Sequence, residues 1–136
     1  MARQRAASAG PAEARTRLRA AQAYLQVAEL VLDEQGRDEF LNVSAGLAVL
    51  AGVAASDAIC AARLGKIPRG QDHRDAAKLL EQAVANGRAI AQTFLRLIDM
   101  KDEAHYGVFV VAPRRARDAA KWARRLVEAA QHEVER

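Results

Sequence analysis

The stretch that decides the fold runs from Phe40 to Gly65 and reads FLNVSAGLAVLAGVAASDAICAARLG. It has no charged residue from Leu41 to Ser56, and it is rich in alanine and glycine, so its surface is apolar but small-sided. A helix of this kind needs other helices packed closely against it on several sides. We therefore predict that it forms the central helix of a bundle, about 39 Å long at 1.5 Å per residue.

Amphipathic segments predict further helices on both sides of this stretch. Apolar residues recur at intervals of three and four residues from Leu18 to Leu32, which predicts a first helix over residues 12–34. Asp72 is placed to cap a later helix, and Gly65 with Pro68 ends the central one. The remaining helices are expected to begin after Asp72, at Arg88 and at Pro113.

The domain organisation follows from these segments. Residues 1–11 are small and polar with several arginines, so we expect a disordered N-terminal arm. Residues 12–136 then form a single helical-bundle domain, all-α, with an up-and-down arrangement of about five helices. The run VFVVAP over residues 108–113 is too short for a sheet, and we expect it to be an extended connector.

Composition limits the partners and the compartment. The 136 residues carry a net charge of +4, and an isoelectric point of about 9.7 suits a polyanionic partner. Cys60 is the only cysteine and is expected to be a small buried hydrophobe, which fits a reducing cytoplasm. The uncharged run of the central helix is shorter than a membrane span requires. We therefore expect a cytoplasmic protein that does not cross a membrane.

Asp57 interrupts the apolar surface of the central helix. A carboxylate in that position must find a cation or hydrogen-bond donors, or else stay protonated. We expect a buried ion pair with Lys101, which follows the fourth helix. In the alternative interpretation, Asp57 and Lys101 contact a ligand.

The segment KDEAHYG, which begins at Lys101, places titratable groups together at a helix end. Here His105 can serve as a general acid or base, and Lys101 can stabilise an oxyanion. In the alternative interpretation, His105 is a helix cap or a surface group. The other histidines, His73 and His132, lack partners at ligand spacing, so we predict neither a metal site nor a cofactor.

A basic stripe is predicted along the last helix. On a helical wheel, five cations gather opposite the alanine-rich side: Arg114, Arg117, Lys121, Arg124 and Arg125. Such a stripe can follow a phosphate backbone, and the alternative is a solvated face.

These features together resemble the HEPN superfamily of helical bundles. The likeness covers about residues 12–133 and is carried by RLRAAQAYLQVAEL, SDAICAARLGK, RGQDHRDAAKLLEQA, LIDMKDEAHYG and the alanine-rich last helix. It implies a bundle of four or more helices that often pairs as a homodimer. Many members are metal-independent RNA-cleaving toxins or defence nucleases, and others are non-catalytic companions of nucleotidyltransferases or bind RNA.

In the nucleolytic members, an arginine followed after four to six residues by a histidine marks the active site. Lys101 and Tyr106 hold this spacing here with other residue types, whereas Arg125 and His132 satisfy it in the last helix, away from the KDEAHYG segment. We therefore expect a dimeric, HEPN-like, non-catalytic binding module, in a toxin–antitoxin or defence setting. Its ligand would be RNA, a nucleotide or a partner protein such as a nucleotidyltransferase.

The binding residues under this hypothesis are Asp57, Lys101, Arg114, Arg117, Lys121 and Arg124. The alternative is a divergent metal-independent endoribonuclease, in which His105, Lys101 and Tyr106 are catalytic. A second alternative is a structural dimerisation domain.

Overall fold

The computed structural model describes residues 6–34, 38–69, 72–107 and 110–136. Within these ranges the chain forms the elements β1 (Ala6–Ser8), α1 (Pro11–Leu32), α2 (Glu39–Leu64), β2 (Lys66–Pro68), α3 (His73–Ala83), α4 (Gly87–Ile98), α5 (Lys101–Tyr106) and α6 (Pro113–Glu135). Five of these helices have at least eleven residues, whereas α5 has six. The prediction of an all-α bundle of about five helices is confirmed.

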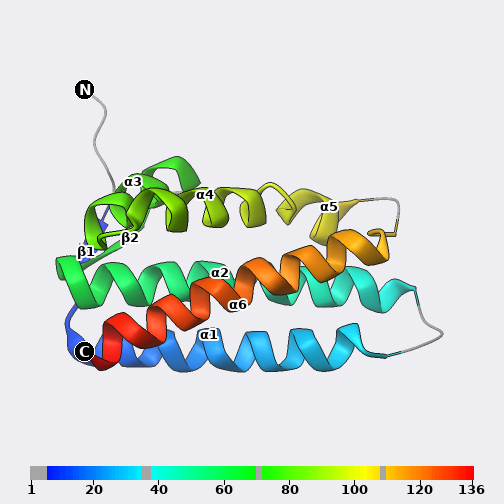
Figure 1. Cartoon of the computed structure of the whole chain (residues 1–136), viewed down its shortest axis with the longest axis horizontal. Coiled ribbons are helices and arrows are strands. Elements are labelled where there is room, and N and C mark those ends of the chain that lie inside the picture. The colour runs from blue at the N-terminus through cyan, green and yellow to red at the C-terminus, as the bar shows by residue number, and fades with distance from the viewer. Residues whose placement is uncertain (1–5, 35–37, 70–71, 108–109) are drawn as a thin grey trace.

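Helix α2 lies at the centre of the bundle. In Figure 1, α1 and α2 run side by side, α6 crosses them, and α3 to α5 lie on the other side of α2. Helix α2 packs against every other helix of the described chain, and most of its fourteen buried residues are alanine, glycine or serine. These small side chains let the helices approach closely, so that the Ser44 hydroxyl donates a hydrogen bond of 2.8 Å to the Ala28 carbonyl oxygen of α1.

Among the described helices, α2 alone is long and apolar enough to cross a membrane. Most of that stretch is buried inside the bundle. A core helix meets the same criteria of length and composition, so this finding does not establish a membrane span.

Local sequence signals fix several helix ends. Helix α2 stops at Gly65, whose φ of 69° is the left-handed conformation that glycine adopts without strain. The Asp72 side chain accepts a hydrogen bond of 2.9 Å from the Arg74 N–H at the start of α3. The predicted cap at Asp72 is therefore confirmed.

Part of the expected disordered arm belongs to regular elements instead, because residues 6–8 form a strand and residue 11 begins a helix. Strand β1 pairs antiparallel with β2, and the Ala9 N–H donates a hydrogen bond of 3.0 Å to the Gly65 carbonyl oxygen. Helix α1 then begins at Pro11. Backbone groups beyond the end of α2 need partners, and β1 provides them. Such a short alanine-rich strand has no sequence pattern of its own. Residues 1–5 of the expected arm lie outside the described residues.

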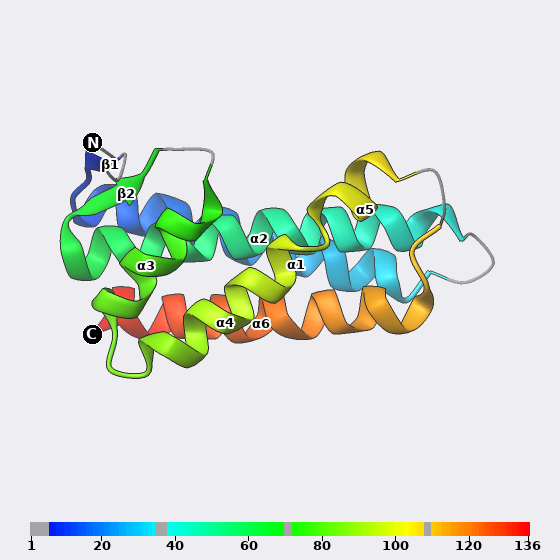
Figure 2. The ribbon, with the colours of Figure 1, turned by 90° about the horizontal axis from the view of Figure 1, so that it is seen from above.

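The segment after α5 reaches α6 across the end of α2. Residues 110–112 are neither helix nor strand, and Ala112 has an extended backbone. Val111 is fully buried, and its N–H donates a hydrogen bond of 2.9 Å to the Asn42 side chain of α2. The described part of this segment agrees with the expected connector, whereas Val108 and Phe109 lie outside the described residues. Figure 2 shows α5 above the first half of α2.

Candidate functional site

Helix α2 places Asp57 in a cavity at the end of the bundle that carries the two strands. The cavity has a volume of about 360 Å³, and its walls come from β1, α1, α2 and the segment of β2. Four charged residues line it: Glu13, Arg17, Asp57 and Arg69. Two acidic and two basic side chains from separate parts of the chain therefore line the same cavity.

Arg17 is the cation that pairs with Asp57. Its Nε and Nη2 atoms each lie 3.0 Å from the Asp57 Oδ2 atom. The Asp57 side chain is 15% exposed. Burial raises the pKa of this carboxyl to about 6, although the charges of Arg17 and Arg69 act in the opposite direction. Asp57 therefore changes protonation just below neutral pH.

The predicted pairing of Asp57 with Lys101 is wrong. Helix α5 packs on a different part of α2, where the His105 Nε2 atom lies 3.3 Å from the Gly46 carbonyl oxygen. Gly46 precedes Asp57 by eleven residues, which is about 16 Å along a helix. Helix α1 is instead the antiparallel neighbour of α2, so its first turns bring Arg17 level with Asp57.

Cys60 follows Asp57 by one helical turn and is fully buried. Burial, with the Asp57 charge, raises the pKa of its thiol to about 12. The expected role of Cys60 as a small buried hydrophobe is consistent with both observations.

The residues considered for catalysis all lie on the short helix α5. The His105 and Tyr106 rings lie edge to face with their centroids 5.9 Å apart, and Tyr106 is 72% exposed. Lys101 precedes His105 by four residues on α5, and its charge is the second cause, after burial of the His73 ring, of the lowered pKa of His73. The His105 and Tyr106 rings thus contact each other, while the His105 Nε2 atom lies against the Gly46 carbonyl oxygen of α2.

Exposed cations follow one side of α6, as the sequence predicts. Four of them have no ion-pair partner within the described chain, and we call them the α6 basic stripe: Arg114, Arg117, Lys121 and Arg125. Arg124, in contrast, forms an ion pair with Glu29 of α1. Its Nε atom donates a hydrogen bond of 2.9 Å to Oε2, and its Nη2 atom donates one to Oε1. This ion pair raises the pKa of Arg124. Arg124 therefore joins α6 to α1.

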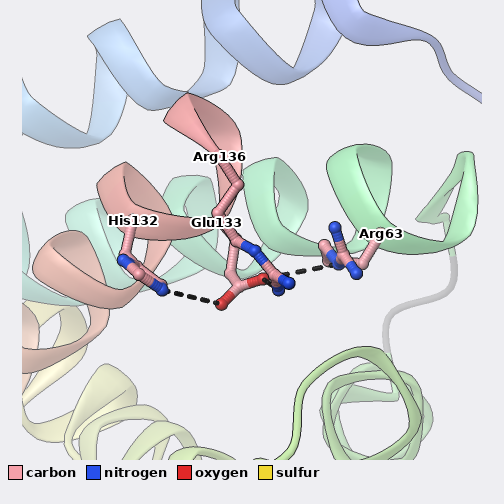
Figure 3. A network of polar contacts seen from close by, with 4 residues as sticks. All are labelled: Arg63, His132, Glu133 and Arg136. Carbon is pink, nitrogen blue, oxygen red and sulfur yellow. Dashed lines mark hydrogen bonds and ion pairs between the residues drawn. The ribbon is translucent and has the colours of Figure 1, made fainter.

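A further polar cluster lies where the ends of α2 and α6 meet. The Glu133 side chain is 10% exposed and lies 3.4 Å from Arg63 and 3.0 Å from Arg136, with His132 at 4.0 Å (Figure 3). Sequence reasoning missed this cluster, since Arg63 and Glu133 are seventy residues apart and no motif links them. Its contacts tie the last turn of α6 to the last turn of α2.

Within the ranges that the structure describes, no three histidine, cysteine or acidic side chains are placed to hold a metal ion. Comparison of the chain with protein-family models gives no match, and comparison with curated proteins gives none either. The resemblance to the HEPN superfamily therefore stays a prediction that rests on the quoted motifs.

Proposed function

We propose that this protein is a HEPN-like, non-catalytic module that binds single-stranded RNA through the α6 basic stripe. The observation that carries the proposal is that four exposed cations without an ion-pair partner in the described chain lie along one side of α6. The neighbouring Arg115 and Arg124 are paired with carboxylates of other helices, whereas the four stripe residues have no such partner in the described chain. Arg114 and Arg125 are eleven positions apart, about 16 Å along the helix, so the cations of the stripe can contact successive phosphates.

The non-catalytic part of the proposal rests on the geometry of α5. A general acid–base group must lie within hydrogen-bond reach of the reacting atoms, with donors for the developing charge nearby. His105 instead has its Nε2 atom 3.3 Å from the Gly46 carbonyl oxygen, so one of its ring nitrogens is already engaged within the fold. The endoribonuclease alternative keeps one supporting observation, which is that His105 and Tyr106 are both exposed to solvent.

We expect RNA affinity to fall linearly on a log–log plot against salt concentration. Replacing Arg117 or Lys121 by glutamine should lower the slope by about 0.7 each, because each phosphate that a cation neutralises on a single strand releases about 0.7 of a counterion. Fluorescence anisotropy with a labelled unstructured RNA measures these slopes.

Two matched controls accompany this titration. Arg96→Gln removes an exposed arginine from α4, and Arg124→Gln removes one that Glu29 already neutralises. Both should leave the slope nearly unchanged. A slope that responds equally to all four substitutions would contradict the stripe, and no binding at low salt would shift the proposal to a protein partner.

The same RNA should remain intact during prolonged incubation with the protein and a chelator. The reason is that the His105 Nε2 atom is engaged with the Gly46 carbonyl oxygen, and that Lys101 and Tyr106 hold the nucleolytic spacing without its arginine and histidine. Gel electrophoresis of the labelled RNA checks this result. Cleavage that persists through repeated purification and disappears in His105→Ala would establish the endoribonuclease alternative instead.

A further inference from the structure

A cavity of about 410 Å³ lies where the start of α1 meets the ends of α2 and α6. Each of these helices contributes one arginine to its lining: Arg15, Arg63 and Arg136. Among the described residues that line it, Glu133 alone is acidic. The lining side chains therefore carry three positive charges and one negative charge, an excess of two positive charges.

The Glu133 carboxylate positions two of these arginines. Its Oε1 atom lies 3.4 Å from the Arg63 Nε atom and 3.0 Å from the Arg136 Nη1 atom. Both guanidinium groups lie on the same side of the carboxylate, with His132 on the other side (Figure 3). Each contact uses one nitrogen of a group that has five N–H donors. Both arginines therefore keep donors for a further acceptor.

Arg15 adds a charge that the contact between α2 and α6 does not require. The ion pair of Arg63 with Glu133 is sufficient to join those two helices. Arg15 is exposed and has no ion-pair partner among the described residues. Glu13, two residues earlier, accepts a hydrogen bond from the Gly10 N–H and lines the neighbouring cavity instead. The arginines thus outnumber the carboxylates that this end of the bundle offers them.

The cavity lies beyond the C-terminal end of the α6 basic stripe. His132 and Arg136 follow Arg125 by seven and eleven residues, which places them on the same side of α6. The exposed Glu128 also lies on this side and interrupts the run of cations. Arg125 and Arg136 are about 16 Å apart along the helix. The cavity is therefore a separate cationic site, which a strand that follows the stripe can reach.

We propose that this cavity binds the terminal phosphate of the RNA strand. The inference rests on the proposed function, because the stripe is what brings the end of the strand to the cavity. A terminal phosphate carries a charge of about −1.5 to −2 at neutral pH, whereas a phosphate within a strand carries about −1. The excess of two positive charges matches the terminal group. Guanidinium groups also suit it, because they donate paired N–H groups to phosphate oxygens.

Three RNAs of one unstructured sequence test the inference: one with a 5′-phosphate, one with a 3′-phosphate and one with hydroxyl groups at both ends. Each competes with an internally labelled RNA, and fluorescence anisotropy measures the displacement. We expect one phosphorylated RNA to bind about tenfold more tightly than the hydroxyl-ended RNA, because its terminal group adds charge-assisted hydrogen bonds. The preferred end gives the direction of the strand along α6.

Arg15→Gln and Arg63→Gln should each remove most of this preference and leave the affinity for the hydroxyl-ended RNA nearly unchanged. Arg96→Gln, an exposed position of α4, should keep the preference. Thermal unfolding checks the fold of each variant, and Arg15 has no described ion pair to lose. Equal affinity for the three RNAs, or a preference that survives both substitutions, would overturn the inference and leave the proposed function in place. Absence of binding by all three RNAs would contradict the proposed function, and this inference with it.

Discussion

Replacing Gly52 by leucine is expected to lower the free energy of unfolding by roughly 3 kcal/mol or more. A Cβ atom at this position would lie close to Leu97 Cδ2 of α4 and 3.3 Å from Leu126 Cδ1 of α6. Both leucines are fully buried, so neither can move into solvent to make room. Overpacking must therefore separate α2 from two helices at once. Urea titration of the unfolding midpoint measures this loss.

Two comparisons make the experiment specific. Arg117→Leu adds apolar volume on an exposed position of α6 and should change stability by less than about 0.5 kcal/mol. In a Gly52→Ala background, Leu97→Val should recover part of the lost stability, because it removes volume at the point of contact. Equal midpoints for Gly52→Leu and Arg117→Leu would contradict the central packing of α2.

The second large effect concerns pH. The pKa of Asp57 is about 6 in the folded protein against 3.8 for the ordinary group. Between these values the folded state binds a proton that the unfolded state has released, so stability must fall as pH rises. The contribution is present in full below pH 3.8 and is lost as pH rises through about 6. We expect a loss of up to about 3 kcal/mol across this window.

Asp57→Asn should remove this dependence, since asparagine resembles the protonated carboxyl and does not titrate. The measured quantity is the difference in unfolding free energy between the variant and the wild type at each pH, which cancels the contributions of other groups. The exposed Asp102→Asn provides a matched control and should give a much flatter difference. If the difference in unfolding free energy between Asp57→Asn and the wild type also stays constant with pH, the Asp57 carboxyl is not in a desolvated environment.

The helices could be predicted because their signals are local. The small-sided stretch around Gly52, the stop at Gly65 and the proline at 113 each act on neighbouring residues in the chain. Strand β1 could not be predicted, because its reason for forming is the unpaired backbone beyond α2, more than fifty residues away.

The same contrast between local signals and contacts distant in the sequence applies to the candidate site. Asp57 could be identified because a single carboxylate on an apolar helix requires an explanation. Its partner could not, since the chain has seventeen arginines and only the alignment of α1 with α2 selects Arg17. Lys101 lies in a polar segment, but polarity along the chain carries no information on its distance from Asp57. The pairing of Glu133 with Arg63 depends on the same kind of alignment between α2 and α6.

The small side chains of α2 also determine how the bundle comes apart. Burying alanine or glycine costs almost no rotamer entropy, but it also brings little apolar surface out of water. Helix α2 therefore contributes few large side chains to any single neighbour, although it contacts all of them. Because every other helix of the described chain packs on α2, loss of one neighbour exposes part of the helix on which the remaining contacts depend. We therefore expect the bundle to unfold cooperatively and not one helix at a time.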